Sequence, residues 1–195
     1  MTQTELLRTL GKSMETKKDI RKRILEERSY MSENERWERS HSICKAVTTH
    51  PFFLNAKDIY CYLPVKGEVD TSEIINCAWN LGKRTAAPRI IGDEMEFFYF
   101  RSFDELKIDR YNIPAPKAVD LAKAGDAVMI MPGAVFDKER HRIGYGKGYY
   151  DRYLALHPLC KTIAIGFDFQ VQEYIPYEEH DICPQYLITE EKIYG

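Results

Sequence analysis

Residues 127–156 read AVMIMPGAVFDKERHRIGYGKGYYDRYLAL. The stretch begins with an apolar run of strand length at 127–132 and ends with a helical pattern at 149–156, and a long glycine-containing loop joins the two. An apolar run without polar alternation is typical of a strand buried in a parallel sheet. A strand, a loop and a helix in this order predict one unit of an open α/β sheet, where ligands bind beyond the carboxyl ends of the strands.

The same alternation continues along the chain. A helical pattern at 71–82 follows the first of the other strand-length runs. We therefore predict a Rossmann-like, three-layer α/β fold with an open, largely parallel sheet and helices on both faces. The other strand-length runs are DIYCYLP (58–64), RTAAPRI (84–90), MEFFYF (95–100), TIAIGF (162–167) and QYLIT (185–189).

The N-terminal quarter has a helical pattern. Between residues 14 and 28 the sequence is strongly charged, with a narrow apolar stripe that includes Ile20 and Ile24. Ser32, with Glu35 three residues later, fits the capping box that opens a helix, and this second helix is expected to end near Pro51. We therefore expect a helical segment before the first strand.

Composition fits a single globular domain covering residues 1–195. Hydrophobic residues are 44% and charged residues 30% of the chain, the balance of an ordinary folded protein. A formal net charge of −2 argues against nucleic acid as a partner, and no run reaches the ~18 apolar residues of a membrane span. The sequence leaves open whether residues 1–13 are ordered.

The cysteines indicate a reducing compartment. The chain has five cysteines, and no two have the C-x-x-C spacing of a metal or redox pair. The N-terminal sequence MTQTELLRTLGKSMETKK mixes acids and bases and lacks the apolar core of a secretion signal. We therefore expect a cytoplasmic protein without a membrane partner.

The glycine loop has the composition of an anion site. Gly144, Gly146 and Gly148 alternate, so the backbone can approach a ligand closely with its N–H groups turned inward. Lys147 and Arg142 add positive charge, and the following helix presents its N-terminus to the same place. These features favour a bound phosphate.

The loop matches neither common phosphate motif. In G-x-G-x-x-G the third glycine comes one residue later, and in G-x-x-x-x-G-K-[ST] a hydroxyl for magnesium stands where this chain has Tyr149. Asp151, in the first turn of the helix, is the alternative magnesium ligand. The same pattern is also typical of a tight turn followed by a capping aspartate, and the residues alone leave both interpretations open.

This stretch resembles a known family, the 5-formyltetrahydrofolate cyclo-ligases, also called 5,10-methenyltetrahydrofolate synthetases. That family has a proline-glycine pair, a phenylalanine-aspartate pair, and then an arginine before a glycine-tyrosine-glycine-x-glycine-tyrosine-tyrosine-aspartate loop. Here these are PG at 132–133, FD at 136–137 and RIGYGKGYYDRYL at 142–154. The resemblance extends over roughly 17–189 and favours a functional loop over a plain turn.

The resemblance implies a role for each matching segment. KKDIR at 17–21 stands where the family has a basic segment of its ATP site, Glu68 stands in a substrate-contacting position, and His180–Asp181 stands where the family's aspartate is a second magnesium ligand. The implied catalytic residues are Arg142 and Lys147, and the implied magnesium ligands are Asp151 and Asp181. The implied ATP-binding residues are Lys17, Lys18, Asp19, Ile20, Arg21, Arg142, Ile143, Gly144, Tyr145, Gly146, Lys147, Gly148, Tyr149 and Tyr150. The implied substrate-binding residues are Glu68, Tyr145, Gly146, Lys147, Gly148 and Tyr149.

Three positions depart from the family pattern. Arg140 stands where the family usually has a glycine in a turn, so the turn is expected to differ locally. Gln185 stands where a second acid is common, which makes the metal geometry at Asp181 less secure than at Asp151. Some members have a basic residue in place of Tyr145. The other histidines, including His141, are scattered and are expected to be surface or structural residues.

The resemblance implies an enzyme that converts 5-formyltetrahydrofolate to 5,10-methenyltetrahydrofolate with ATP and Mg²⁺ and releases ADP and phosphate. The γ-phosphoryl is expected to activate the formyl oxygen before the substrate's own N10 closes the ring. This chemistry needs positioning and charge rather than a protein nucleophile. Fold alone leaves open a sugar-phosphate isomerase, an acyl-transferase-like enzyme, or a non-catalytic nucleotide- or folate-binding protein. We expect a monomer that binds small molecules.

Overall fold

The structure is a computed structural model that describes residues 15–65, 67–109, 112–123, 125–179 and 181–195. The open question about residues 1–13 and the prediction for His180 lie outside these ranges. The prediction of a single domain stays a prediction. Among the described residues, no helix has both the length and the apolar character needed to cross a membrane.

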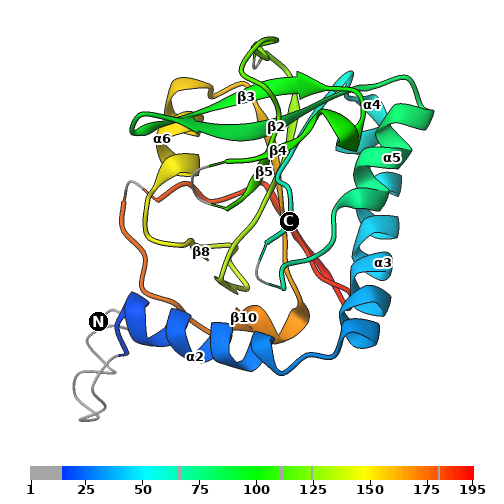
Figure 1. The fold of residues 1–195 in the computed structure, drawn as a ribbon. Coiled ribbons are helices and arrows are strands. Elements are labelled where there is room, and N and C mark those ends of the chain that lie inside the picture. Colours follow the sequence, from blue (N-terminus) through cyan, green and yellow to red (C-terminus); the bar gives the residue numbers. More distant parts are fainter. Residues whose placement is uncertain (1–14, 66, 110–111, 124, 180) are drawn as a thin grey trace.

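The main sheet of the described chain has seven strands in the order β12-β11-β9-β6-β1-β2-β3 (Figure 1). The five inner strands run parallel, and β12 and β3 join the two edges antiparallel, so the prediction of an open, largely parallel sheet is confirmed. The strands are β1 Asp58–Cys61, β2 Arg84–Ile91, β3 Glu94–Phe100, β6 Val128–Met131, β9 Lys161–Ile165, β11 Tyr186–Ile188 and β12 Ile193–Tyr194.

Helices cover both faces of this sheet, as predicted. Side chains of each strand alternate between the faces, so Ile59 and Cys61 pack in one hydrophobic cluster while Tyr60 packs in another. The helices α3 (Glu33–Thr49), α4 (Pro51–Asn55) and α5 (Ser72–Asn80) pack against the first cluster, and α6 (Tyr149–Leu156) packs against the second.

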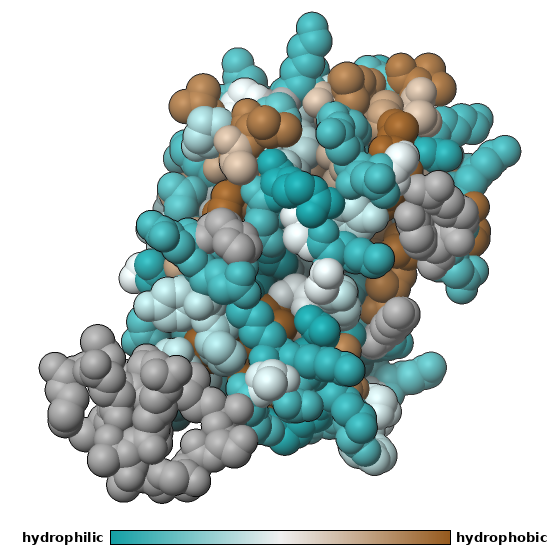
Figure 2. All heavy atoms as spheres, turned by 90° about the vertical axis from the view of Figure 1, so that its left-hand side faces the viewer, coloured by the Kyte–Doolittle hydropathy of each residue, from teal (hydrophilic) through white to brown (hydrophobic). Residues whose placement is uncertain are grey.

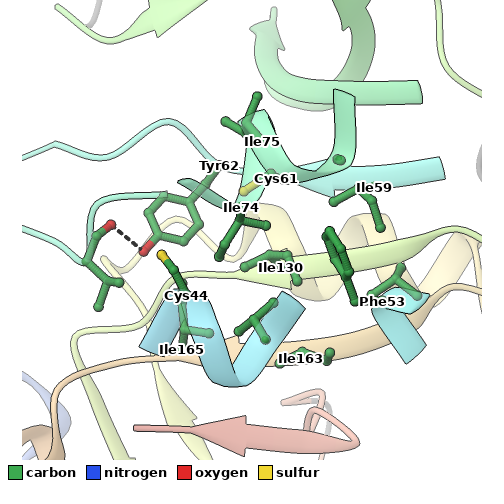
Figure 3. Packing of buried hydrophobic residues seen from close by; sticks show 14 of the residues in the cluster. Cys44, Phe53, Ile59, Cys61, Tyr62, Ile74, Ile75, Ile130, Ile163 and Ile165 are labelled. Atoms are coloured by element: carbon green, nitrogen blue, oxygen red, sulfur yellow. Dashed lines mark hydrogen bonds between the residues drawn. The ribbon is translucent and has the colours of Figure 1, made fainter. Parts of the chain in front are cut away.

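The cluster under α3 and α5 is built largely from isoleucines (Figure 3). Ile74 from α5, Ile130 from β6 and Ile163 from β9 are fully buried there. At the edge of the cluster the Tyr62 hydroxyl donates to the Val69 carbonyl at 3.0 Å. This bond fixes the chain just after β1, which is where the sheet meets its ligand side.

A third hydrophobic cluster attaches α2 (Lys17–Ser29) to the rest of the molecule. Ile20 and Ile24 of α2 pack on Val135 and Ile143, which belong to a small separate sheet. The prediction of one long loop after residue 132 was wrong in this respect, because burial under α2 makes two parts of it short strands. The small sheet consists of β10 Val171–Gln172, β7 Val135–Asp137 and β8 Arg142–Ile143.

Local hydrogen bonds explain where the N-terminal helices begin. Thr16 and Asp19 form a reciprocal capping box at the start of α2. The Ser32 hydroxyl accepts from the Glu35 N–H at 3.2 Å and opens α3, as predicted, and α3 ends one residue before His50, which caps α4. The remaining short elements are η1 Phe103–Glu105, β4 Lys107–Ile108, β5 Pro114–Ala115 and η2 Asp168–Gln170.

Candidate active site

A cavity of about 830 Å³ lies beyond the carboxyl ends of β1 and β6. Its wall includes Tyr62 and Pro64, which follow β1, and Pro132, which follows β6. The glycine loop 144–148 forms another part of the wall. The volume is that of a ligand pocket, and the position is the one that open α/β sheets use for ligands.

The loop glycines serve two different purposes. Gly146 and Gly148 have φ of +91° and +63°, in the left-handed region that glycine adopts at low cost. Gly144 does not need a positive φ, but a Cβ there would lie 2.9 Å from Nη1 of Arg142. Two glycines therefore shape the loop, and the third leaves room for a buried arginine.

Arg142 lies beneath this loop rather than in its open part. Its side chain is 5% exposed, and its Nη2 lies 3.0 Å from both carboxylate oxygens of Asp151. The guanidinium carbon lies 5.7 Å from the centre of the Tyr150 ring. The Arg142 Nε is buried and has no hydrogen-bond partner among the described residues. Arg142 is thus held in place by Asp151 while it lines the cavity.

The two predicted metal ligands, Asp151 and Asp181, both line the cavity. Asp151 also accepts from the Ile182 N–H at 3.1 Å, which brings the residue after Asp181 beside it. The Asp181 carboxylate contacts Nζ of Lys17 at 2.6 Å and accepts from the Glu178 N–H at 2.8 Å. Burial opposes protonation of Lys17, but its hydrogen bonds to Asp181 and Glu178 raise its pKa overall.

Helix α2 brings only part of the predicted segment 17–21 to the cavity. Lys17 and Arg21, one turn apart, line it, and Nη1 of Arg21 donates to the Gly144 carbonyl at 3.3 Å. The described lining does not include Lys18, which is exposed, Asp19, which caps the helix, or Ile20, which is buried. An ATP-binding role for these three is unsupported by their placement.

Glu68 is buried beside several tyrosines. It is 6% exposed, and it accepts from the Val65 N–H at 2.9 Å, which closes the turn after β1. Burial and the nearby Glu68 charge raise the pKa of Tyr145 and Tyr150 well above the usual value for tyrosine. The Tyr145 hydroxyl also accepts from Nη1 of Arg28 at 3.0 Å. Glu68 thus supplies a buried acceptor on one wall of the cavity.

Lys147 and Tyr149 lie at the open end of the loop. Lys147 is exposed and lines the cavity, and its ammonium group makes no hydrogen bond or ion pair with another described residue. Its carbonyl accepts from Nη1 of Arg152 at 2.8 Å, and the Arg152 guanidinium carbon lies 5.2 Å from the Tyr149 ring centre. The backbone around Lys147 is therefore held, while its ammonium group faces solvent.

The sequence did not predict the apolar end of the cavity. Ile90 of β2, Met95 of β3 and two residues near the β4–β5 hairpin, Ile108 and Ile113, line it. Arg28, which contacts Tyr145, was also missed. The proline within the β2 sequence was the one signal of an irregular strand edge here, and nothing in 102–115 marked a ligand wall.

The donor groups at Asp151 and Asp181 fit magnesium. Mg²⁺ takes oxygen ligands and is commonly held by one or two carboxylates together with substrate phosphates. The described residues contain no group of three or more His, Cys, Asp or Glu side chains arranged for a metal, so a zinc-type cage is not present among them. Two carboxylates, Asp151 and Asp181, that line the same cavity as the glycine loop are instead the kind of oxygen donors that magnesium takes.

Hydrophilic residues cover most of the face that Figure 2 shows, and larger hydrophobic groups gather toward its upper edge. The cavity itself combines both characters, with charged groups near Lys17, Arg142 and Lys147 and apolar groups near Ile90 and Met95. The fold and the cavity together define the class: an α/β protein whose open sheet carries a candidate small-molecule site at the carboxyl ends of its strands.

Comparisons with known proteins identify the family. The family model described as "5-formyltetrahydrofolate cyclo-ligase family" matches residues 13–190. A 5-formyltetrahydrofolate cyclo-ligase of Mus musculus is 30% identical over 190 residues, covering 90% of this chain and 94% of the relative, and that of Escherichia coli K12 is 28% identical, covering 88% and 98%. The chain belongs to the 5-formyltetrahydrofolate cyclo-ligase family, a family of ligases.

Solved structures agree. The 5,10-methenyltetrahydrofolate synthetase of Aquifex aeolicus superposes with a TM-score of 0.81 at 30% identity, covering 91% of each chain. That of Mycoplasma pneumoniae gives a TM-score of 0.72 at 26% identity, covering 89% of this chain and 98% of the other. The fold predicted from the sequence is therefore also that of solved relatives.

Proposed function

We propose that the protein converts 5-formyltetrahydrofolate to 5,10-methenyltetrahydrofolate, using ATP and Mg²⁺ and releasing ADP and phosphate. One observation carries this proposal: in this member of the cyclo-ligase family, a cavity lies at the strand ends. The glycine loop, Lys17, Arg21 and Glu68 line that cavity. Its charged lining residues suit a triphosphate, and its apolar lining residues suit a flat ring system.

The chain contributes positioning and charge to this reaction. A formyl oxygen is a poor leaving group, so the ATP γ-phosphoryl is transferred to it, substrate N10 attacks the formyl carbon, and phosphate leaves. Lys147 and the loop N–H groups stabilise the charge on the transferring phosphoryl, and Arg142 adds fixed positive charge beneath the loop. Glu68 contacts the folate. When held by Asp151 and Asp181, magnesium would neutralise charge on the ATP oxygens.

The remaining parts of the proposal concern substrate contacts, oligomeric state and location in the cell. We infer that Tyr145, Tyr149 and the glycines 146 and 148 contact the substrates, because they line the cavity. Tyr149 and Tyr150 are both half-buried. Tyr150, whose ring lies beside the buried Arg142 guanidinium, is assigned to packing, and Tyr149 to stacking on a ligand ring. We also propose a cytoplasmic monomer whose partners are small molecules, which size-exclusion chromatography with light scattering would test for the monomer.

The experiment is an absorbance assay. The purified protein is incubated with 5-formyltetrahydrofolate and Mg²⁺, with and without ATP, and the near-ultraviolet absorbance of the methenyl product is followed. The proposal requires product only when ATP is present, with one ADP released per product. Binding of ATP or folate without any product would instead support a non-catalytic binding protein, and this outcome would overturn the proposal.

A further inference from the structure

The segment 173–185 joins β10 to β11 and carries Asp181. Its described residues form no helix or strand, so contacts with other elements determine its position. On the cavity side these contacts are the Lys17–Asp181 ion pair and the bond from the Ile182 N–H to Asp151. Both contacts lie at the candidate magnesium site, so other contacts must hold the segment on the side away from the cavity.

The turn between β7 and β8, residues 137–141, contacts the segment from the other side. Nε of Arg140 donates to the Pro184 carbonyl at 3.2 Å, and the Cys183 thiol donates to the Glu139 carbonyl at 3.2 Å. The ring of His141 stacks on Tyr177, with the ring centres 3.7 Å apart and an angle of 3° between the planes. These three contacts, together with an exposed ion pair between Lys138 and Glu173 at the start of the segment, tie the turn to the segment on both sides of Asp181.

The turn is itself rigidly built. Asp137 is 1% exposed, and its carboxylate accepts from the His141 N–H at 2.8 Å and contacts Nδ1 of the same histidine at 2.8 Å. Arg140 has a φ of +73°, in the left-handed region where glycine is favoured. A glycine would fit this backbone more easily, but it would have no guanidinium to reach Pro184.

We propose that Arg140 and His141 are positioning residues, which hold the segment 173–185 so that the Asp181 carboxylate and the Ile182 N–H stay beside Asp151. Arg140 does this through its hydrogen bond to the carbonyl of Pro184, which follows Asp181 in the sequence. His141 does it by stacking on Tyr177, which precedes Asp181. The inference rests on the proposed function in one respect, because it takes Asp151 and Asp181 as the magnesium ligands.

Hydrogen–deuterium exchange of the metal-free protein tests the structural part. In Arg140→Gly the peptide covering 176–186 should exchange about tenfold faster, because a hydrogen bond to the segment is lost. The thermal midpoint should stay equal or rise, since glycine adopts the left-handed backbone more easily. Lys138→Ala is the matched control, because it removes a contact between the same turn and the start of the segment, at Glu173, that is exposed on both sides and lies eight residues from Asp181 in the sequence, so it should leave exchange at 176–186 unchanged.

His141 is tested by a pair of variants. His141→Ala removes both the stack on Tyr177 and the contact with Asp137, and it should speed exchange at 176–186 as Arg140→Gly does. His141→Phe keeps a flat ring for Tyr177 and should restore most of the protection. If exchange at 176–186 is unchanged in both Arg140→Gly and His141→Ala, the segment does not depend on the turn and the proposal is overturned.

Magnesium dependence tests the link to the site. ATP binding is measured by calorimetry at increasing magnesium concentration, and the half-saturating concentration should rise about tenfold in Arg140→Gly but not in Lys138→Ala. An unchanged value in Arg140→Gly, with faster exchange at 176–186, would overturn the positioning role. If wild-type protein binds ATP without any need for magnesium, the proposed function fails, and the exchange data alone decide whether the turn holds the segment.

Discussion

Lys147 differs from Lys17 and Arg142 because its charge is not shared with a carboxylate; among the described residues the same holds for Arg21, which donates to the Gly144 carbonyl. Lys17 and Arg142 lie in ion pairs with Asp181 and Asp151, whereas Lys147 has no such partner among the described residues. Its backbone carbonyl is nevertheless held by a hydrogen bond from Arg152. A cation that is positioned but unpaired is suited to meet an incoming anion.

Replacing Lys147 by alanine should lower turnover about a hundredfold, because one preorganised charge on the transferring phosphoryl is lost. Folding should be unaffected, since the side chain is exposed. Steady-state kinetics together with a circular dichroism melt check both points. Lys147→Arg keeps the charge and should retain more activity, and near-normal turnover in a folded Lys147→Ala protein would remove Lys147 from the mechanism.

Gln185 stands where the family commonly has an acid, but it is not among the described residues that line the cavity. Its Oε1 accepts from the Thr162 N–H at 2.9 Å, and its own N–H donates to the Thr162 hydroxyl at 2.9 Å. These two bonds connect the start of β11 to the neighbouring β9. The residue is therefore structural in this position.

Gln185→Asp should lower the free energy of unfolding by about 1 kcal/mol, because the shorter side chain loses its bond to Thr162. Urea denaturation measures this change. The magnesium concentration needed for ATP binding should not change. Tighter magnesium binding in this variant would show that residue 185 reaches the metal after all.

The site residues were predicted from the composition of the glycine loop and, for Glu68 and Asp181, from the family resemblance, and their roles stay predictions. The loop residues, Glu68 and Asp181 all line the cavity. All five residues of the segment 17–21 were predicted to bind ATP. In a helix, however, residues four apart, here Lys17 and Arg21, lie on the same face. The helical pattern could have selected Lys17 and Arg21 from the sequence alone.

At the scale of elements, α2 is held to the molecule by a small hydrophobic cluster. Ile24 is fully buried between α2 and the small sheet, while α2 carries Lys17 and Arg21 to the cavity. The strands of that sheet could not be predicted, because runs of two or three residues resemble a loop until another element covers them. Most runs of the main sheet were predictable because they hold three to five consecutive apolar residues.

Ile24→Ala should lower the free energy of unfolding by about 3 kcal/mol, the usual cost of a cavity in a packed core. Affinity for ATP should also fall, because α2 positions Lys17 and Arg21. Urea denaturation and calorimetry measure the two effects. Lys22→Ala, exposed on the same helix, should change neither by more than about 0.5 kcal/mol, and equal effects of the two variants would contradict the role of the cluster.

At the scale of the whole molecule, buried thiols make the free energy of unfolding fall as the pH rises into the alkaline range. Burial raises the pKa of Cys61 from 9.0 to about 12, and that of Cys160 to about 12. Above pH 9 these thiols ionise in the unfolded chain but stay protonated in the folded one. The unfolded state then binds fewer protons, so the free energy of unfolding falls as the pH rises.

The free energy of unfolding should therefore fall between pH 9 and 12, with about 1 kcal/mol per pH unit from Cys61 alone. Urea denaturation at pH 7, 9 and 10, with a reductant, measures the slope. Cys61→Ala should be less stable at pH 7 and show a shallower fall above pH 9. Equal slopes for the two proteins would mean that Cys61 does not stay protonated when folded.

The packing of α2 on the small sheet has a consequence for synthesis on the ribosome. The helix is made early, yet the residues that bury Ile20 and Ile24 are Val135 and Ile143, more than a hundred positions later in the chain. Until those residues emerge, the apolar stripe of α2 has no cover within the cluster it finally joins. Lys17 and Arg21 therefore reach the loop only after residues 135–148 have been synthesised. The packing of α2 depends on long-range contacts, which form slowly and leave apolar surface exposed meanwhile.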